Sequence, residues 1–257
     1  MTQNTEPELS YFGLQAYMGT TKHMGGLETT KRLIDLCHID ANTRILDVGC
    51  GAGATASYLI TTHGCTVVGV DIRESMVNLS RERARKEGVE DSAEFKIADA
   101  RDLPFEADSF DVVLCESVAT FVVEKLQVAN ELARVTRPGG YVGLNEEIWI
   151  KPPPAELSKA ARQLWEIKPE LPTAGEWQQI LESVGLQDIL VEAYQFDSRR
   201  ESSQLKRYRL EDMWRMIHRT GSLYFRNRAF REYMKNRQRL PKKVFEYLGY
   251  AVLVGQK

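Results

Sequence analysis

Arg44-Ile-Leu-Asp-Val-Gly-Cys-Gly-Ala-Gly-Ala54 is the stretch that decides the fold of this chain. A short apolar run ends in Asp47, and Gly49, Gly51 and Gly53 follow at every second position. Apolar residues then recur at helical spacing, so the stretch predicts a strand, a glycine turn and a helix. Glycine is needed in such a turn where a Cβ would strike a ligand or forbid the backbone conformation. The turn and the start of the helix therefore form a candidate site for a nucleotide-like ligand.

Two classes of ligand compete for this loop. Gly49, Gly51 and Ala54 satisfy the G-x-G-x-x-G/A pattern of proteins that bind dinucleotides. Asp47 and the three glycines also satisfy D/E-x-G-x-G-x-G, which is typical of methyltransferases that use S-adenosylmethionine. Asp47 favours the second class, because a carboxylate at this point repels a pyrophosphate and attracts the ammonium group of a methionine.

Three further motifs follow in order along the chain. Thr66-Val-Val-Gly-Val-Asp71 predicts a second buried strand that ends in an acid. A short strand over 93–97 leads into Ala98-Asp99-Ala100, and Arg137-Pro-Gly-Gly140 precedes another apolar run. With these motifs the segment 26–147 resembles the class I S-adenosylmethionine-dependent methyltransferases with a type 11 methyltransferase domain. This subgroup includes the ubiquinone/menaquinone C-methyltransferases and many small-molecule methyltransferases.

The resemblance implies a fold and a set of functional residues. The fold is α/β, a doubly wound, mostly parallel seven-stranded sheet of the Rossmann-like methyltransferase type; periodicity alone supports only a doubly wound α/β protein. Residues implied to bind the cofactor S-adenosyl-L-methionine are Tyr17, Asp47, Gly49, Gly51, Gly53, Asp71, Ile72, Asp99, Ala100 and Cys115. Among them Asp71 would accept the ribose hydroxyls, Ile72 would lie against the adenine, and Asp99 would accept from its amino group. The competing interpretation of Asp47 and Asp71 is that strand-end acids cap the next helix.

Such a site does not need to activate the methyl group, because the sulfonium is already an activated methyl donor. Alignment of donor and acceptor for in-line displacement supplies much of the rate. A general base is needed only where the acceptor must lose a proton early. The candidates are His23, Glu116 and Glu146.

Composition limits the other functions. The 257 residues carry a net charge of −2, which argues against wholesale binding of nucleic acid. No apolar stretch approaches the roughly twenty residues of a transmembrane helix, and the polar start of the chain does not resemble a signal peptide. The four cysteines form no C-x-x-C pair and the four histidines are scattered, so we expect a cytoplasmic protein without a metal site.

The chain divides into a core and two additions. Residues 1–25 are expected to be an irregular N-terminal arm that acts as a lid, and 26–196 with 244–257 form the S-adenosylmethionine-binding domain. Its last strand, near 247–254, is expected to pair antiparallel at the edge of the sheet. Residues 197–243 are a basic helical insertion with fifteen Lys and Arg against five acids, about +10, which leaves about −12 on the rest. In this insertion Trp214, Ile217, Gly221 and Phe225 recur at helical spacing and are expected to face inward.

The sequence therefore predicts a methyltransferase that acts on a small or medium-sized acceptor. The insertion is interpreted as a substrate cap over the site whose charges are mostly solvated. A second interpretation is that a few of its inward arginines bind an anionic acceptor. One alternative is a nicotinamide-dependent oxidoreductase, and another is a methyltransferase that reaches a protein side chain, a nucleic acid or a membrane surface through the insertion. The atom that receives the methyl group, O, N, S or C, and the oligomeric state stay open.

Overall fold

Seven strands form one sheet in the computed structural model, which describes residues 7–165, 170–237 and 242–257. Their order across the sheet is β3-β2-β1-β4-β5-β7-β6. The bounds are Arg44–Val48 (β1), Thr66–Asp71 (β2), Ala93–Ile97 (β3), Phe110–Glu116 (β4), Thr136–Trp149 (β5), Gln187–Gln195 (β6) and Leu248–Gln256 (β7). The pairs from β3 to β5 are all parallel, which confirms the doubly wound, mostly parallel sheet.

The position of β7 corrects one prediction. This strand was expected at the edge of the sheet, but it lies between β5 and β6 and is antiparallel to both. All residues from Leu248 to Gly255 are buried, as the interior of a sheet requires, whereas β6 alternates between partly buried and exposed residues. The long apolar run that ends the chain is therefore typical of a strand with neighbours on both sides and helices on both faces.

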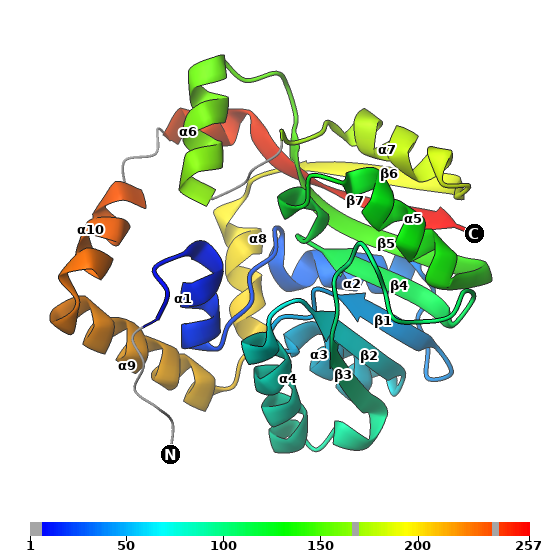
Figure 1. Cartoon of the computed structure of the whole chain (residues 1–257), viewed down its shortest axis with the longest axis horizontal. Coiled ribbons are helices and arrows are strands. Elements are labelled where there is room, and N and C mark those ends of the chain that lie inside the picture. Colours follow the sequence, from blue (N-terminus) through cyan, green and yellow to red (C-terminus); the bar gives the residue numbers. More distant parts are fainter. Residues whose placement is uncertain (1–6, 166–169, 238–241) are drawn as a thin grey trace.

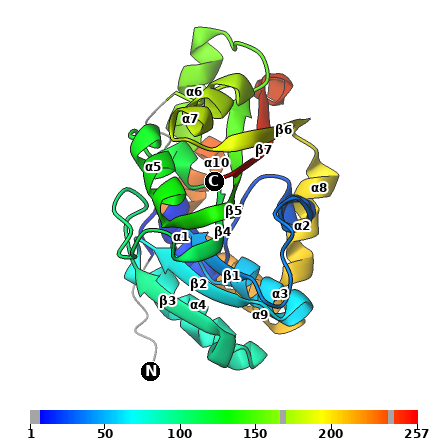
Figure 2. The same cartoon turned by 90° about the vertical axis from the view of Figure 1, so that its right-hand side faces the viewer.

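Helices cover both faces of the sheet (Figure 2). On one face lie α5 (Lys125–Val135) and α7 (Ala174–Ser183), which bury Leu132 and Trp177 against the strands. On the other lie α2 (Gly26–Leu36), α3 (Ala54–His63) and α4 (Glu74–Glu87), with Leu33 and Leu59 fully buried. The core thus holds the carboxyl ends of β1, β2 and β4 in fixed positions beside the glycine turn.

The N-terminal arm is more regular than expected. It contains the helix α1 (Tyr11–Met18), which begins where the Ser10 hydroxyl accepts a hydrogen bond of 3.0 Å from the Gly13 amide. The helix ends at Gly19, whose φ of 71° is the left-handed conformation that favours glycine. The prediction of an irregular arm is wrong for these eight residues, because a serine cap and a glycine stop give the helix its two ends.

The insertion is helical, as predicted. It contains α8 (Ser198–Ser202), α9 (Leu210–Arg226) and α10 (Arg228–Arg237), while α6 (Ala155–Trp165) precedes it in the chain. Figure 1 shows α9 and α10 at the periphery of the molecule, with α1 on their inner side. None of the described helices is long and apolar enough to cross a membrane.

The apolar stripe of α9 faces the opposite way from the prediction. Trp214, Ile217 and Phe225 are 71%, 57% and 83% exposed. The buried residue of α9 is Leu223, which packs against Leu14 of α1 and Phe230 of α10. Helical spacing establishes that apolar residues share one side, but it does not establish which side meets the protein.

Candidate active site

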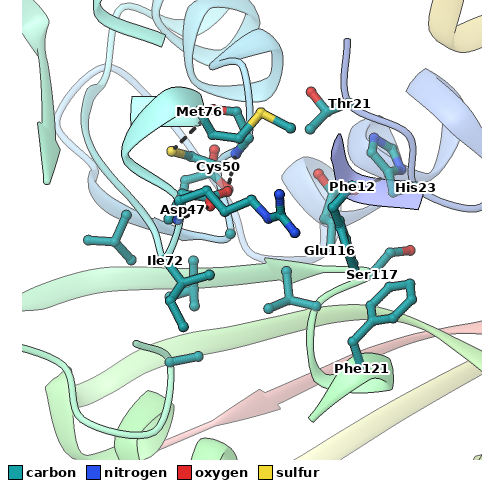
Figure 3. A pocket seen from close by; sticks show the side chains of 18 of the residues that line it. Phe12, Thr21, His23, Asp47, Cys50, Ile72, Met76, Glu116, Ser117 and Phe121 are labelled. Carbon is teal, nitrogen blue, oxygen red and sulfur yellow. Dashed lines mark hydrogen bonds and ion pairs between the residues drawn. The ribbon is translucent and has the colours of Figure 1, made fainter. Parts of the chain in front are cut away.

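A cavity opens at the carboxyl ends of β1, β2 and β4, the place where open α/β sheets bind ligands (Figure 3). It collects most of the residues that the sequence assigned to cofactor binding. These lining residues are Asp47, Gly49, Gly51, Asp71, Ile72, Asp99 and Ala100. His23 and Glu116, two of the three predicted catalytic residues, line the same cavity.

Three predicted cofactor residues are not among those that line the cavity. The Tyr17 ring lies against α9, with the Arg219 guanidinium 5.6 Å from its centroid. Cys115 is fully buried in β4, and burial raises the pKa of its thiol well above the usual value. Gly53 begins α3 with φ 73°, and a Cβ there would come within 2.8 Å of the Ser80 Cβ. These contacts give Gly53 a role in the backbone turn and in the packing of α3 against α4.

The glycine turn is fixed to the end of β2 by Asp71. One carboxylate oxygen accepts a bond of 3.0 Å from the Gly51 amide, and the other accepts one of 2.9 Å from the Arg73 amide. Burial raises the pKa of this carboxyl, and the two amides partly offset that effect. Each oxygen keeps a lone pair, because a carboxylate has about four acceptor sites. Asp71 therefore caps the local backbone and still has acceptor capacity toward the cavity.

Asp99 offers a second carboxylate, from the loop that follows β3. Arg101 donates to both of its oxygens, at 2.7 to 3.2 Å, and holds the pKa of this carboxyl below its usual value. Ile72, which also lines the cavity, is 64% exposed. An apolar surface flanked by two carboxylates suits an adenosine, whose base is flat and apolar and whose ribose and amino group donate hydrogen bonds.

His23 and Glu116 meet at the inner end of the cavity. The His23 Nδ1 lies 3.5 Å from a Glu116 oxygen and 3.3 Å from the Met24 carbonyl. These two neighbours are acceptors, and the Asn145 amide nitrogen, a donor, lies 3.3 Å from the same Nδ1, so this ring nitrogen has partners of both kinds. Glu116 is held in turn by the hydroxyls of Thr30, at 3.0 Å, and Thr55, at 3.3 Å. This buried network joins the arm to the carboxyl end of β4.

Glu146 has a different environment from the other two candidates. It is fully buried, and its two oxygens accept from the amides of Val118, Ala119 and Thr120 at 2.7 to 3.1 Å. Desolvation and the neighbouring Glu147 raise the pKa of Glu146 to about 7. These contacts fasten the loop after β4, so they favour a positioning role over direct contact with an acceptor.

The loop after β4 completes the wall of the cavity. It leaves β4 through Ser117, whose φ of 54° is rare for a residue with a side chain. The loop then presents Phe121, which meets Phe12 of the arm edge to face at 4.7 Å and lies 5.9 Å from Tyr11. All three aromatic rings line the cavity. The sequence predicted the arm as a lid but gave no role to Phe121, whose signal was an apolar run shortly after a buried strand.

Among the described residues, those of the arm cover the cavity and those of the insertion do not. Lining residues from the arm include Phe12, Thr21 and Lys22, whereas no described residue of 197–243 lines it. The substrate-cap interpretation of the insertion therefore lacks direct contact with the site.

The insertion instead holds the arm at three points. The Tyr208 hydroxyl accepts from the Thr21 amide at 2.8 Å and donates to the Thr21 carbonyl at 3.0 Å. Arg219 donates to the Tyr17 carbonyl at 2.6 Å. Glu201 accepts from the Gly25 amide at 2.6 Å. The Thr21 methyl lies against Gly51, where any Cβ would overlap it, so the arm is packed directly on the glycine turn.

Comparisons with known proteins agree with this geometry. Residues 46–144 match a family model described as a methyltransferase domain. The methyltransferase GfsG of Streptomyces halstedii is 37% identical over 119 residues, which are 46% of this chain and 43% of that protein. The 27-O-demethylrifamycin SV methyltransferase of Amycolatopsis mediterranei is 36% identical over 138 residues, 54% of this chain and 50% of that protein. The matched segments thus span about half the length of these relatives or less.

The fold is also found in solved structures. A phosphoethanolamine N-methyltransferase of Haemonchus contortus, in complex with phosphomonomethylethanolamine and S-adenosylhomocysteine, has a TM-score of 0.73 at 20% identity. That alignment covers 95% of this chain and 57% of the other. At this identity the likeness shows a common fold.

Proposed function

The chain carries a class I S-adenosylmethionine-dependent methyltransferase domain, and from this premise we propose that it transfers a methyl group to a small-molecule acceptor. The observation that carries the proposal is the single cavity that joins Asp47, the glycine turn, Asp71 and Asp99. A dinucleotide-binding turn needs the glycines, but it has no use for the carboxylate of Asp47 beside a pyrophosphate. The relatives named above are methyltransferases as well.

In this proposal the donor lies along the carboxyl ends of the strands. Asp71 accepts from the ribose hydroxyls in charge-assisted hydrogen bonds, and Ile72 lies against the adenine. Asp99 accepts from the adenine amino group, with the Ala100 amide beside it. Asp47 attracts the ammonium of the methionine end at the glycine turn. The backbone at Gly49 and Gly51, with φ of 76° and 52°, gives the turn its close approach.

The acceptor is proposed to enter between the arm and the loop after β4. Phe12, Phe121 and the arm exclude water from the reacting centre. The acceptor nucleophile then displaces the thioether in line, and the methyl group passes to it. For a hydroxyl acceptor His23 takes the proton and Glu116 stabilises the resulting imidazolium, whereas an amine that binds as the free base needs no such step.

Other features of the acceptor and the cell compartment are part of the same proposal. An anionic acceptor is supported by two cations that line the cavity, Lys22 and Arg73, and not by the arginines of the insertion. Arg73 is already engaged with Glu8 at 3.2 Å and with the Phe12 ring, so Lys22 is the stronger candidate. A cytoplasmic location is supported by the four cysteines, which are all free and buried.

A substrate screen tests this function. The full chain is incubated with S-adenosylmethionine labelled in its methyl group and with a panel of small alcohols, phenols, amines and thiols. We expect label in a small organic product, with transfer lost when Asp71 and Asp99 are both replaced by Asn. Label found only in protein or nucleic acid would refute the small-molecule acceptor.

A further inference from the structure

The outer side of α9 is an apolar surface that no part of the chain covers among the residues that the structure describes. Leu210, Trp214, Ile217 and Phe225 are 76%, 71%, 57% and 83% exposed, and Tyr224 beside them is 48% exposed. They lie on one side of a 17-residue helix: Leu210, Trp214 and Ile217 are three to four residues apart, and Tyr224 and Phe225 follow on the same side after Gly221. Single exposed apolar residues are common, but a continuous row with Trp and Phe is typical of a binding surface.

The α9 helix exposes its apolar side to solvent, whereas an ordinary surface helix buries that side against the protein. Its polar side faces the protein, where Asp212 lies 3.8 Å from the buried Arg83 of α4 and Arg219 binds the arm. Leu223 is buried on that side as well. The specific polar contacts fix the orientation of the helix, so the exposure of the apolar row is built into the fold and is not a loose packing of α9.

The charge around the apolar row indicates what it meets. Exposed cations outnumber exposed acids among the described side chains of 205–237. The cations are Lys206, Arg209, Arg226, Arg228 and Lys235, and the acids are Glu211 and Glu232. Glu232 and Arg228 pair with each other at 3.1 Å, which leaves four exposed cations against Glu211. Apolar and aromatic residues beside a surplus of Arg and Lys are the pattern of helices that lie in the interface of an anionic bilayer.

From these observations we propose that α9 docks the protein on the surface of an anionic lipid bilayer. Leu210, Trp214, Ile217 and Phe225 enter the boundary between headgroups and acyl chains, and exposed cations of the same insertion meet lipid phosphates. The helix lies along the surface and does not cross it. A second copy of the chain is the less favourable occupant, because a twofold contact through α9 would bring two insertions of about +10 together.

Sedimentation with lipid vesicles tests the proposal on the full chain. The vesicles contain equal amounts of phosphatidylglycerol and phosphatidylcholine, or phosphatidylcholine alone. We expect binding to the anionic vesicles that is at least about tenfold tighter than to the neutral ones and that weakens as salt is raised. Trp214 provides a second readout, since its emission should shift to the blue on binding and the shift should be absent in Trp214→Phe.

A matched pair of variants identifies the surface. Trp214→Ser with Phe225→Ser should lower the affinity for anionic vesicles at least about tenfold. Leu126→Ser, at a residue of α5 that is 52% exposed, should leave it unchanged. All three proteins should stay folded at the temperature of the assay, because each altered side chain is more than half exposed.

Three outcomes would overturn the proposal. The first is absence of binding to anionic vesicles, and the second is equal binding by wild type and the Trp214/Phe225 variant. The third is a dimer in light scattering that becomes a monomer in that variant, which would assign the apolar row to a second copy of the chain. None of these readouts depends on methyl transfer, so the proposal stands or fails separately from the function proposed above.

Discussion

The variant Tyr208→Phe, which removes one hydroxyl group from the insertion, should weaken binding of the methyl donor. In Tyr208→Phe the ring stays beside Arg83, whose guanidinium lies 5.0 Å from its centroid, but both hydrogen bonds to the Thr21 backbone are lost. Each such bond contributes about 0.5–1.5 kcal/mol net, so the pair contributes about 1–3 kcal/mol to the closed arm. Thr21 packs on Gly51 at the donor end of the cavity. If the closed arm is the state that binds the donor, Kd for S-adenosylhomocysteine should rise about 5- to 150-fold.

Calorimetric titration of the purified variant measures this change. Tyr224→Phe is the control, because it removes a hydroxyl from the same insertion at a residue that is 48% exposed. Hydrogen exchange of the arm should be slowed by S-adenosylhomocysteine in the wild type and much less in Tyr208→Phe. An unchanged Kd, together with unchanged exchange, would refute the idea that the insertion controls donor binding through the arm.

Three further predictions concern other contacts of the site. Arg219→Gln should weaken donor binding, because the hydrogen bond from Arg219 to the Tyr17 carbonyl is lost. Arg226→Gln, at an exposed arginine of the same helix, should leave donor binding unchanged. Calorimetry on both variants separates the effect of this one contact from the effect of net charge. His23→Gln should lower kcat for a hydroxyl acceptor by about 10²- to 10⁴-fold with little change in donor Kd, and equal kcat would remove His23 as the base. The folded-state pKa of Glu146 is about 7, above its ordinary 4.5, so the folded chain holds this proton more tightly than the unfolded chain does. The free energy of unfolding should therefore fall as pH rises from about 4.5 to about 7, and the contribution of Glu146 to this fall is at most about 3 kcal/mol. Denaturant titrations at both ends of this range should show Glu146→Gln gaining on the wild type at the higher pH, and a constant difference would contradict the assignment.

Local sequence was sufficient to predict which residues of the first strands lie together at the cavity. A strand that ends in an acid, a turn of glycines and the next strand-end acid lie within about thirty residues, so Asp47, Gly51 and Asp71 had to come together once the strands formed. Asp99 joined them because β3 pairs with β2 in parallel. Each of these placements depends on adjacent strands and short connections, which sequence patterns describe well.

The remaining errors concern contacts between distant segments. Either β6 or β7 could lie next to β5, and the structure places β7 there. The alternation of apolar and polar residues within a strand predicts which face is buried, but it does not predict which strand is its neighbour. The side of α9 that meets the protein was decided by the partners of Asp212 and Arg219, which lie in α4 and the arm. The contact between the Tyr17 ring and Arg219 also joins distant segments, and no local pattern predicts it.

Binding of S-adenosylmethionine to the purified chain is the most direct test of the central claim. Calorimetry should show saturable binding of the donor and no comparable binding of NAD. Asp71→Asn should weaken donor binding at least about tenfold, because the ribose loses a charged acceptor. Asp91→Asn, at an exposed aspartate outside the cavity, should not weaken it. Donor affinity that is the same in Asp71→Asn as in the wild type, or NAD binding tighter than S-adenosylmethionine binding, would contradict the account.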